Sequence, residues 1–398
     1  MTRAIIGRPA GLRSQIRSIG LLKEIKHGEF RVLFTPEHIR KLVNATKAKV
    51  FVSERAGEWI GASDLAYASA GATICSRDEA LTKDLIVGVK ETQPGDFAKL
   101  GEGSIHMSYE HFAQSQERTL AALEASLKKG VTFIALETMQ DIHGGFPTLA
   151  PMSEAAAEIV SQLAPAMFLR PFGNGYLPSG LPQSNIAGLK AVVLGGGIVG
   201  RTAAIRLISM GVSVKLLEAN PERMRTLKEE LEGRSKLMRV LESNEKTLEE
   251  SFTGSHILVS GVYRRGAAPP KIVNLPLLNR MSKDAIAYFI DVDQGSSFAG
   301  ELPETDILDP FRLPLIDGSH VRTFSPPNLP SMAALHTSQA LGNAVLVYVA
   351  KLAQAGLKEA ALDDNTIATG INIFMSCLCC EGLASTFGVP YRSFRSLV

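Results

Sequence analysis

The stretch "AVVLGGGIVG" (191–200) is an apolar run that breaks into glycines. The apolar residues predict a strand, and "IVGRTAAIRLISMG" (198–211) predicts the helix that follows it. Gly195, Gly197 and Gly200 form the pattern G-x-G-x-x-G between the two. In this pattern the first glycine makes the tight turn, the second lets the backbone approach a pyrophosphate, and the third lets the helix pack on the strand. We therefore predict a dinucleotide-binding site at this turn.

A second predicted strand, "VSVKLLE" (212–218), ends in Glu218, which lies 23 residues after Gly195. That is near the spacing at which a carboxylate accepts hydrogen bonds from both ribose hydroxyls. A carboxylate there also repels a 2′-phosphate, so the sequence predicts NAD rather than NADP. Ile198 and Val199, in the first turn of the helix, are further cofactor-binding candidates. The alternative is a glycine turn in an ordinary doubly wound sheet.

Length and composition limit the class of protein. The chain has 398 residues, which favours two domains, and 45% hydrophobic with 21% charged residues is typical of a globular protein. The formal charge is +2, with no basic stripe interleaved with aromatics, so we expect no nucleic-acid partner. The longest apolar candidate, residues 341–357, is interrupted by Asn343 and Lys351 and predicts a buried helix rather than a membrane span.

The cysteines and the first residues carry weaker signals. Cys377, Cys379 and Cys380 are clustered, but no second group of ligands follows at zinc spacing. We therefore expect these thiols and Cys75 to be free and buried, in a reducing compartment, and we predict no metal site. Residues 1–18 contain four arginines and no acid, which favours a disordered basic extension over an organelle presequence.

Strand-like and helix-like segments alternate along most of the chain. The helical patterns 152–169 and 331–356 bracket the block that contains the glycine turn. Such alternation is typical of parallel sheets covered on both faces. We predict an α/β fold with two doubly wound parallel-sheet domains. A Rossmann dinucleotide-binding domain (151–330) is inserted into a discontinuous substrate domain (19–150 and 331–398).

Polar residues lie near the ends of predicted strands in the first domain. Lys90 follows one apolar strand in "VGVKETQP", His111 follows another in "SYEHF", and Arg31 starts a third in "EFRVLFTP". Ligands of parallel sheets bind outside the carboxyl ends of strands, which suits Lys90 and His111. Singly, each residue has a structural explanation, such as a surface cation or a loop histidine. Together they provide a carboxylate clamp, a second cation and a general acid/base, which an α-amino or α-keto acid requires.

Seven motifs are spread over almost the whole chain from Ile19: "GLLKEIKHGEFRVLFTP", "VKETQP", "LETMQ", "LAPMSEAA", "VVLGGGIVG", "VDQG" and "NLPS". In these motifs the chain resembles the alanine dehydrogenase family, which includes the first domain of pyridine nucleotide transhydrogenase. The resemblance implies NAD-dependent, reversible oxidative deamination of a small L-amino acid, such as alanine to pyruvate. We accordingly expect a cytoplasmic homo-oligomer, a dimer or a hexamer, with no membrane partner.

The resemblance also implies roles for single residues. It identifies Arg31 as the carboxylate-binding arginine and Lys90 as the substrate lysine. It identifies His111 as the catalytic histidine and Asp293, in "VDQG", as a second catalytic residue.

On the cofactor side, Glu218 is similar in position to the ribose-binding acid of the family. Arg223 stands where a basic residue often follows that acid, and Ser153 matches a position that contacts the cofactor.

Four residues depart from the family pattern. Arg264 and Arg265, in "VYRRG", replace apolar residues near the expected nicotinamide end, Glu110 replaces an apolar residue, and His336 replaces an arginine. A more cationic pocket would favour a second carboxylate on the substrate. Two alternatives stay open: a hydride-relay subunit like the transhydrogenase domain, and reductive amination with a larger amine, as in saccharopine dehydrogenases.

Overall fold

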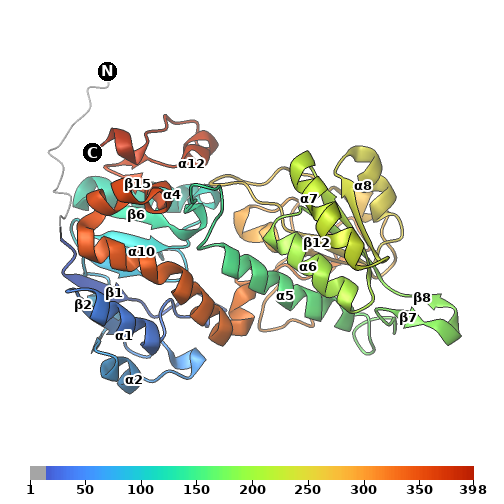
Figure 1. Ribbon diagram of the computed structural model, residues 1–398, viewed down its shortest axis with the longest axis horizontal. Coiled ribbons are helices and arrows are strands. Elements are labelled where there is room, and N and C mark those ends of the chain that lie inside the picture. Colours follow the sequence, from blue (N-terminus) through green and yellow to red (C-terminus); the bar gives the residue numbers. More distant parts are fainter. Residues whose placement is uncertain (1–14) are drawn as a thin grey trace. The chain divides into compact units, whose positions relative to one another are not determined.

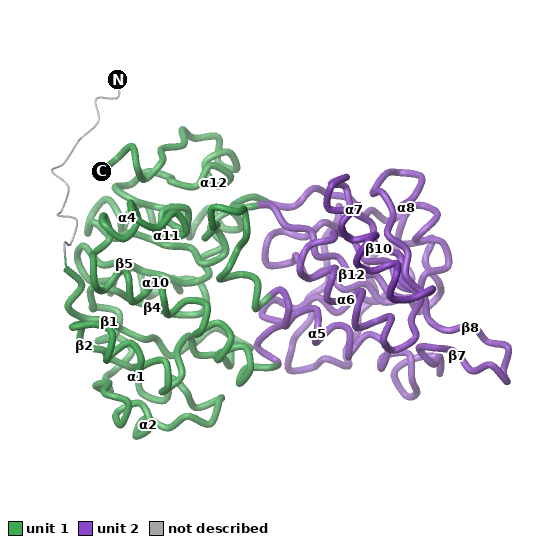
Figure 2. Tube along the Cα trace, viewed as in Figure 1, with its two compact units in different colours: residues 1–152, 265–267, 333–398 green, residues 153–264, 268–332 purple. Residues whose placement is uncertain are grey.

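The computed structural model describes residues 15–398, and the chain divides into two compact units (Figure 2). Unit 1 comprises Met1–Met152, Arg265–Ala267 and Ala333–Val398. Unit 2 comprises Ser153–Arg264 and Ala268–Met332, so in sequence it is inserted into unit 1.

Most of the predicted N-terminal extension lies outside the described residues. Its last residues are nevertheless part of the fold, because Ile16 is buried in the core of unit 1 and the first strand begins at Ser18. The prediction of an extension through residue 18 was therefore wrong at its end, because Ile16 packs in the core and Ser18 begins a strand.

Within the described residues, unit 1 is built on an eight-stranded sheet with the order β16-β15-β6-β5-β4-β1-β2-β3 (Figure 1). Its strands are β1 Ser18–Leu21, β2 Lys49–Ser53, β3 Thr73–Cys75, β4 Leu85–Val87, β5 Ile105–Ser108, β6 Thr132–Ala135, β15 Ile371–Phe374 and β16 Cys377–Leu378. Its helices are α1 Pro36–Ala45, α2 Asp64–Ser69, α3 Arg77–Ala80, α4 Gln116–Lys129, α10 Ala334–Asp363, α11 Asn365–Gly370 and α12 Glu381–Thr386. Its short 3-10 turns are η1 Glu58–Ile60, η2 Phe97–Lys99, η3 Phe112–Gln114, η4 Leu136–Thr138 and η9 Phe394–Ser396.

Both faces of this sheet are buried. In β4, Leu85 and Val87 point into a core shared with α1 and α10, while Ile86 points into a second core shared with α3 and α4. Successive residues of a strand face opposite sides, so a strand that is apolar at every position needs cover on both. Figure 1 shows α1 and α10 on one face of the sheet. This confirms the predicted doubly wound arrangement.

The sheet of unit 1 is parallel except at one edge. There β15 pairs antiparallel with β6, and β16 pairs antiparallel with β15. The predicted parallel sheet therefore carries two antiparallel strands at this edge. An antiparallel strand at the edge of a parallel sheet needs no crossover helix, and here β15 follows α11 without an intervening loop.

Within the described residues, unit 2 contains a parallel six-stranded sheet with the order β11-β10-β9-β12-β13-β14, and a two-stranded hairpin, β7-β8. Its strands are β7 Gly180–Leu181, β8 Ile186–Ala187, β9 Lys190–Leu194, β10 Ser213–Glu218, β11 Met238–Glu242, β12 Ile257–Ser260, β13 Ile286–Phe289 and β14 Arg322–Thr323. Its α-helices are α6 Ile198–Ser209, α7 Pro221–Leu231, α8 Glu245–Phe252 and α9 Leu275–Leu278, and α5 Ala150–Ala166 leads into it from unit 1. Its short 3-10 turns are η5 Pro182–Ser184, η6 Glu232–Arg234, η7 Ile290–Gln294 and η8 Leu329–Ala333.

The long helix α10 carries an apolar stretch, Leu329–Asp363 with its preceding turn, that is long enough to cross a membrane by length and composition. A single helix of this kind is weak evidence for a membrane span, because core helices pass the same test. Leu341, Val345 and Val349 on α10 are buried in the core of unit 1, as expected for the predicted buried helix.

Candidate active site

The carboxyl ends of four neighbouring strands in unit 1 carry the charged residues of the candidate site. The strands lie in the order β6-β5-β4-β1, and all four are parallel. Lys90 follows β4 and His111 follows β5, while Arg31 lies in the segment between β1 and α1. Because parallel strands end at the same edge of a sheet, these segments converge where ligands of α/β proteins bind.

Arg31 lies in a buried irregular segment and not at the start of a strand, so that part of the sequence prediction was wrong. Its Nε and Nη2 atoms each donate to a carboxylate oxygen of Glu29 at 2.6 Å. Its Nη1 atom contacts the sulfur of Met152 at 3.0 Å, which is a weak acceptor. Glu29 therefore fixes the orientation of the Arg31 guanidinium. Because sulfur is a weak acceptor, a carboxylate can replace Met152 as the hydrogen-bond partner of Nη1.

The backbone of Lys90 is held by Glu24. One oxygen of Glu24 accepts from the Val89 N–H at 2.6 Å, and the other accepts from the Lys90 N–H at 3.3 Å. Burial of its carboxyl group, together with the nearby Glu29 carboxylate, raises the pKa of Glu24 to about 7. Lys90 itself is buried, which brings a cation into a low-dielectric part of unit 1.

His111 is held by its backbone and by its ring. Its φ is +46°, in the left-handed region, and its N–H donates to Glu137 at 2.7 Å. Its ring stacks on Tyr109 with 6.1 Å between centroids and an interplanar angle of 15°. Tyr109 in turn donates to the carbonyl of Thr148 at 2.6 Å, so the stacking partner is itself fixed.

Tyr109 also links the histidine to the arginine. Burial raises the pKa of the Tyr109 hydroxyl, and the nearby Arg31 cation partly offsets that rise. Tyr109 thus lies close to both Arg31 and His111. Lys90 is connected to this group through Glu24, which accepts from the Lys90 N–H and interacts electrostatically with Arg31.

The glycine turn of unit 2 connects β9 to α6. Gly195 has φ +86°, and a Cβ on Gly200 would stand 1.8 Å from the Gly195 carbonyl oxygen. A side chain is therefore excluded at Gly200, as close packing of the helix on the turn requires. A Cβ on Gly197 would meet no described protein atom within 4 Å, so the space in front of the helix N-terminus is open.

Glu218 ends β10 beside this turn. One of its oxygens accepts from the Gly196 N–H at 2.7 Å, and the other accepts from the Asn220 N–H at 2.7 Å. Arg223, in the first turn of α7, lies 3.5 Å from the Glu218 carboxylate. The open turn, the helix N-terminus and the fixed carboxylate fit a dinucleotide.

The remaining predicted residues of unit 2 lie on other elements. Ile198 and Val199 are in the first turn of α6, Ser153 is in the first turn of α5, and Asp293 is in η7 after β13.

Two family models match the chain. The model of the N-terminal domain of alanine dehydrogenase and pyridine nucleotide transhydrogenase (PNT) matches residues 20–156, and the model of the C-terminal domain matches residues 161–380. The chain belongs to the alanine dehydrogenase/PNT family.

Individual relatives agree with this assignment. The alanine dehydrogenase of Halomonas elongata is 33% identical over 383 residues, covering 96% of this chain and 99% of the relative. Alanine dehydrogenase 1 of Staphylococcus aureus is 29% identical with the same coverage. A solved L-alanine dehydrogenase has a TM-score of 0.81 at 31% identity, covering 93% of this chain and 99% of that one. A transhydrogenase from Sinorhizobium meliloti, with a TM-score of 0.72 at 18% identity over 92% of this chain and 99% of that one, shares the fold.

The residues that depart from the alanine dehydrogenase/PNT pattern have different environments. Arg265 donates to the carbonyls of Thr138 at 2.9 Å and Thr369 at 2.6 Å, so its guanidinium holds backbone segments of unit 1. These two bonds give Arg265 a structural role within unit 1. Arg264 and His336 are exposed.

The cysteines of this family member are free. Burial raises the pKa of Cys75 to about 11 and that of Cys379 to about 12. These two thiols therefore stay protonated at neutral pH.

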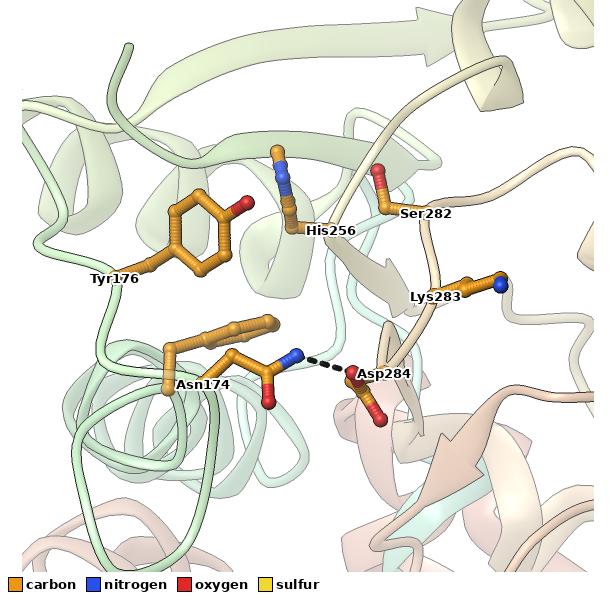
Figure 3. Close-up of a pocket in the computed structure, with 7 residues that line it drawn as sticks. Asn174, Tyr176, His256, Ser282, Lys283 and Asp284 are labelled. Carbon is orange, nitrogen blue, oxygen red and sulfur yellow. Dashed lines mark hydrogen bonds between the residues drawn. The ribbon is translucent and has the colours of Figure 1, made fainter. Parts of the chain in front are cut away.

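A separate cavity of about 260 Å³ lies in unit 2 (Figure 3). His256 and Asp284 precede β12 and β13, so the cavity is at the amino ends of these strands, away from the glycine turn. The Nδ1 atom of His256 accepts from the Lys190 N–H at 3.1 Å, and burial lowers the pKa of this histidine. The cavity contains none of the predicted site residues; its lining is Phe168, Asn174, Tyr176, His256, Ser282, Lys283 and Asp284.

Sequence reasoning missed three carboxylates of the candidate site: Glu24, Glu29 and Glu137. Glu24 and Glu29 lie in "KEIKHGEF" and Glu137 lies in "LETMQ", and both motifs follow an apolar strand. Their position after a strand was the available signal, the same one that identified Lys90 and His111.

Proposed function

We propose that the chain is an NAD-dependent alanine dehydrogenase, which interconverts L-alanine, NAD⁺ and water with pyruvate, ammonium and NADH. The observation that carries the proposal is the convergence of Arg31, Lys90 and His111 at adjacent strand ends. The printed names of relatives that span nearly the whole chain support the same reaction.

In this proposal Arg31 binds the substrate carboxylate through its Nη1 edge. Glu29 already compensates the charge of Arg31, so Lys90 supplies the net positive charge that an incoming carboxylate needs. A hydrogen bond to a charged group contributes about 1.5–3 kcal/mol, which is enough to orient a molecule as small as pyruvate.

Lys90 and His111 then act at the reacting carbon. The ammonium of Lys90 stabilises the negative charge that develops on the carbonyl or carbinolamine oxygen. His111 moves the proton as water adds to the imine or leaves the carbinolamine, because an ordinary histidine pKa of about 6.5 suits transfer in both directions. Asp293 is proposed to orient the water or the ammonia.

The dinucleotide is proposed to lie on the turn from Gly195 to Gly200, with its ribose at Glu218. When bound, NAD supplies the hydride acceptor or donor. Unit 2 contributes the helix N-terminus for the pyrophosphate, and Ser153, Ile198 and Val199 are proposed contacts.

The proposals for cellular location, oligomeric state and partners rest on the same family membership. We propose a cytoplasmic homo-oligomer, dimeric or hexameric, whose partners are a small amino acid and its keto acid. Light scattering on the purified protein tests the oligomeric state.

The function is tested by following NADH oxidation with pyruvate and ammonium. We expect turnover that depends on ammonium and falls on the order of 10²-fold in His111→Ala, with NADH affinity retained. Turnover without ammonium would indicate a hydroxy-acid dehydrogenase, and turnover that needs a free amino acid as amine donor would indicate saccharopine-type chemistry. NADH binding without any keto-acid turnover would favour the hydride relay.

A further inference from the structure

Two buried carboxylates connect the loops that follow β4, β5 and β6. Glu110 lies directly before His111 in the loop after β5, and Glu137 lies in η4 directly after β6. Glu110 is 0% exposed and Glu137 is 4% exposed. Burying a carboxylate is costly unless it is hydrogen-bonded, so both side chains need partners.

Glu110 finds its partners in the loop after β4 and along β5. Its Oε2 accepts from the Thr92 N–H at 3.2 Å, and its Oε1 accepts from the Thr92 hydroxyl at 2.9 Å. The same Oε1 lies 2.9 Å from the Ser108 hydroxyl and 2.8 Å from Nδ1 of His106. Two of these four bonds go to Thr92, which is two residues from Lys90.

Glu110 is held in its ionised form. Burial favours the neutral acid, but the hydrogen bonds and charge of His106, with the bonds from Thr92 and Ser108, keep the pKa of Glu110 below its ordinary value. An ionised carboxylate can only accept, so Nδ1 of His106 carries the hydrogen. The Glu110 carboxylate therefore links the loop after β4 to β5 by accepting hydrogen bonds from both.

Glu137 continues the connection to β6. Its two oxygens accept from the backbone N–H groups of Glu110 at 3.2 Å and His111 at 2.7 Å. The left-handed backbone of His111 costs roughly 1–2 kcal/mol in a non-glycine residue. The two hydrogen bonds to the Glu137 carboxylate offset that cost. They also fix the backbone orientation from which the His111 side chain projects.

We infer that Glu110 and Glu137 are positioning residues that set the place of His111 relative to Lys90. The inference rests on the proposed function, in which Lys90 and His111 act on one substrate. Glu110 stands where the resemblance implies an apolar residue, so packing alone does not require a carboxylate there. Displacement of a reacting group by about 1 Å can cost on the order of 10²-fold in rate, which is what such cross-links prevent.

The test uses isosteric substitutions, Glu110→Gln and Glu137→Gln. Each keeps the shape of the side chain but places an NH₂ group against a donor, so at least one bond of the connection is lost. Thr92→Val, which removes one hydroxyl and leaves the carboxylates in place, is a milder variant in case the glutamine variants fold poorly. The matched control is Asp84→Asn, because Asp84 also accepts two backbone N–H groups, from Arg17 at 2.8 Å and Ser18 at 3.0 Å, but at the amino end of β4.

Two readouts are measured below the melting temperature of every variant. The first is kcat, with its pH profile, for pyruvate and ammonium, alongside the NADH dissociation constant. The second is the nitrogen chemical shift and titration of the His111 imidazole, assigned by comparison with His111→Ala. We expect both glutamine variants to lose roughly tenfold or more in kcat, to bind NADH as the wild type does, and to shift the His111 resonance, with a smaller change in Thr92→Val.

The control should lose thermal stability and change neither readout. Glutamine variants that behave like Asp84→Asn would overturn the inference and leave Glu110 and Glu137 a purely structural role. A wild type without keto-acid turnover would instead overturn the proposed function, and the His111 resonance would still decide the positioning role.

Discussion

Replacing Gly200 with alanine tests how α6 meets the glycine turn. The new Cβ would stand 1.8 Å from the Gly195 carbonyl oxygen, whereas real Cβ atoms essentially never come within 3.0 Å of another heavy atom. The helix and the turn must therefore separate by about 1 Å, and overpacking of this kind costs about 1–3 kcal/mol. For a unit of roughly 150–250 residues each kcal/mol lowers Tm by about 2–4 °C, so we expect a fall of about 2–12 °C with weaker NADH binding.

Gly197→Ala is the matched control in the same turn. Gly197 is the N-cap of α6, with φ −71°, and a Cβ there would meet no described protein atom within 4 Å. Stability should change by less than about 1 kcal/mol, since alanine is a poor N-cap but causes no clash. The methyl group would occupy the space proposed for the pyrophosphate, so NADH affinity should fall about tenfold or more.

Thermal unfolding and NADH fluorescence titration on the two variants separate the roles. An unchanged Tm in Gly200→Ala would refute the packing argument. Wild-type NADH affinity in Gly197→Ala would show that the pyrophosphate lies elsewhere, whatever happens at Gly200.

Further predictions concern the cofactor, the substrate and pH. Glu218 should make kcat/KM higher for NADH than for NADPH, and equal values would mean that Arg223 compensates the repulsion of a 2′-phosphate. Arg265→Ala should lower Tm, because it removes the hydrogen bonds of Arg265 to two backbone carbonyls, and should leave the preference for pyruvate over oxaloacetate unchanged. A change in that preference in Arg264→Ala would instead identify Arg264 as the cation that contacts the substrate. Burial raises the pKa of Asp291 from 3.8 to about 6, so this group favours the folded state most below pH 4 and loses that contribution as pH rises through 6. Between pH 4 and 7 the free energy of unfolding should therefore fall by about 2 kcal/mol more in the wild type than in Asp291→Asn, measured by urea unfolding, and parallel pH profiles would contradict the assignment.

Local signals were sufficient for part of this molecule. The glycine spacing from Gly195 to Gly200 identified the strand, turn and helix that the structure contains. Lys90 and His111 were predicted near strand ends because each lies within three residues of a short predicted strand. In such cases neighbouring residues in sequence determine the conformation.

Other features depend on contacts that are distant in sequence. "FRVLF" reads as a strand, but the Val32 N–H donates to Ser338, 306 residues later on α10, and the segment is buried without joining the sheet. The pairing of Glu24 with the backbone of Lys90, 66 residues later, required the folded chain. The antiparallel edge formed by β15 likewise follows from where the chain re-enters the sheet.

The interrupted order of unit 1 has a consequence for synthesis on the ribosome. Unit 2 is almost continuous in sequence and can fold as it emerges, but β6 has its outer edge paired by β15, which is made on the order of 230 residues later. At about 5–20 residues per second the nascent chain carries that bare edge for roughly 10–50 s. An unpaired strand edge invites association with other chains, so this interval is where a chaperone that binds exposed strands would raise the yield of native protein.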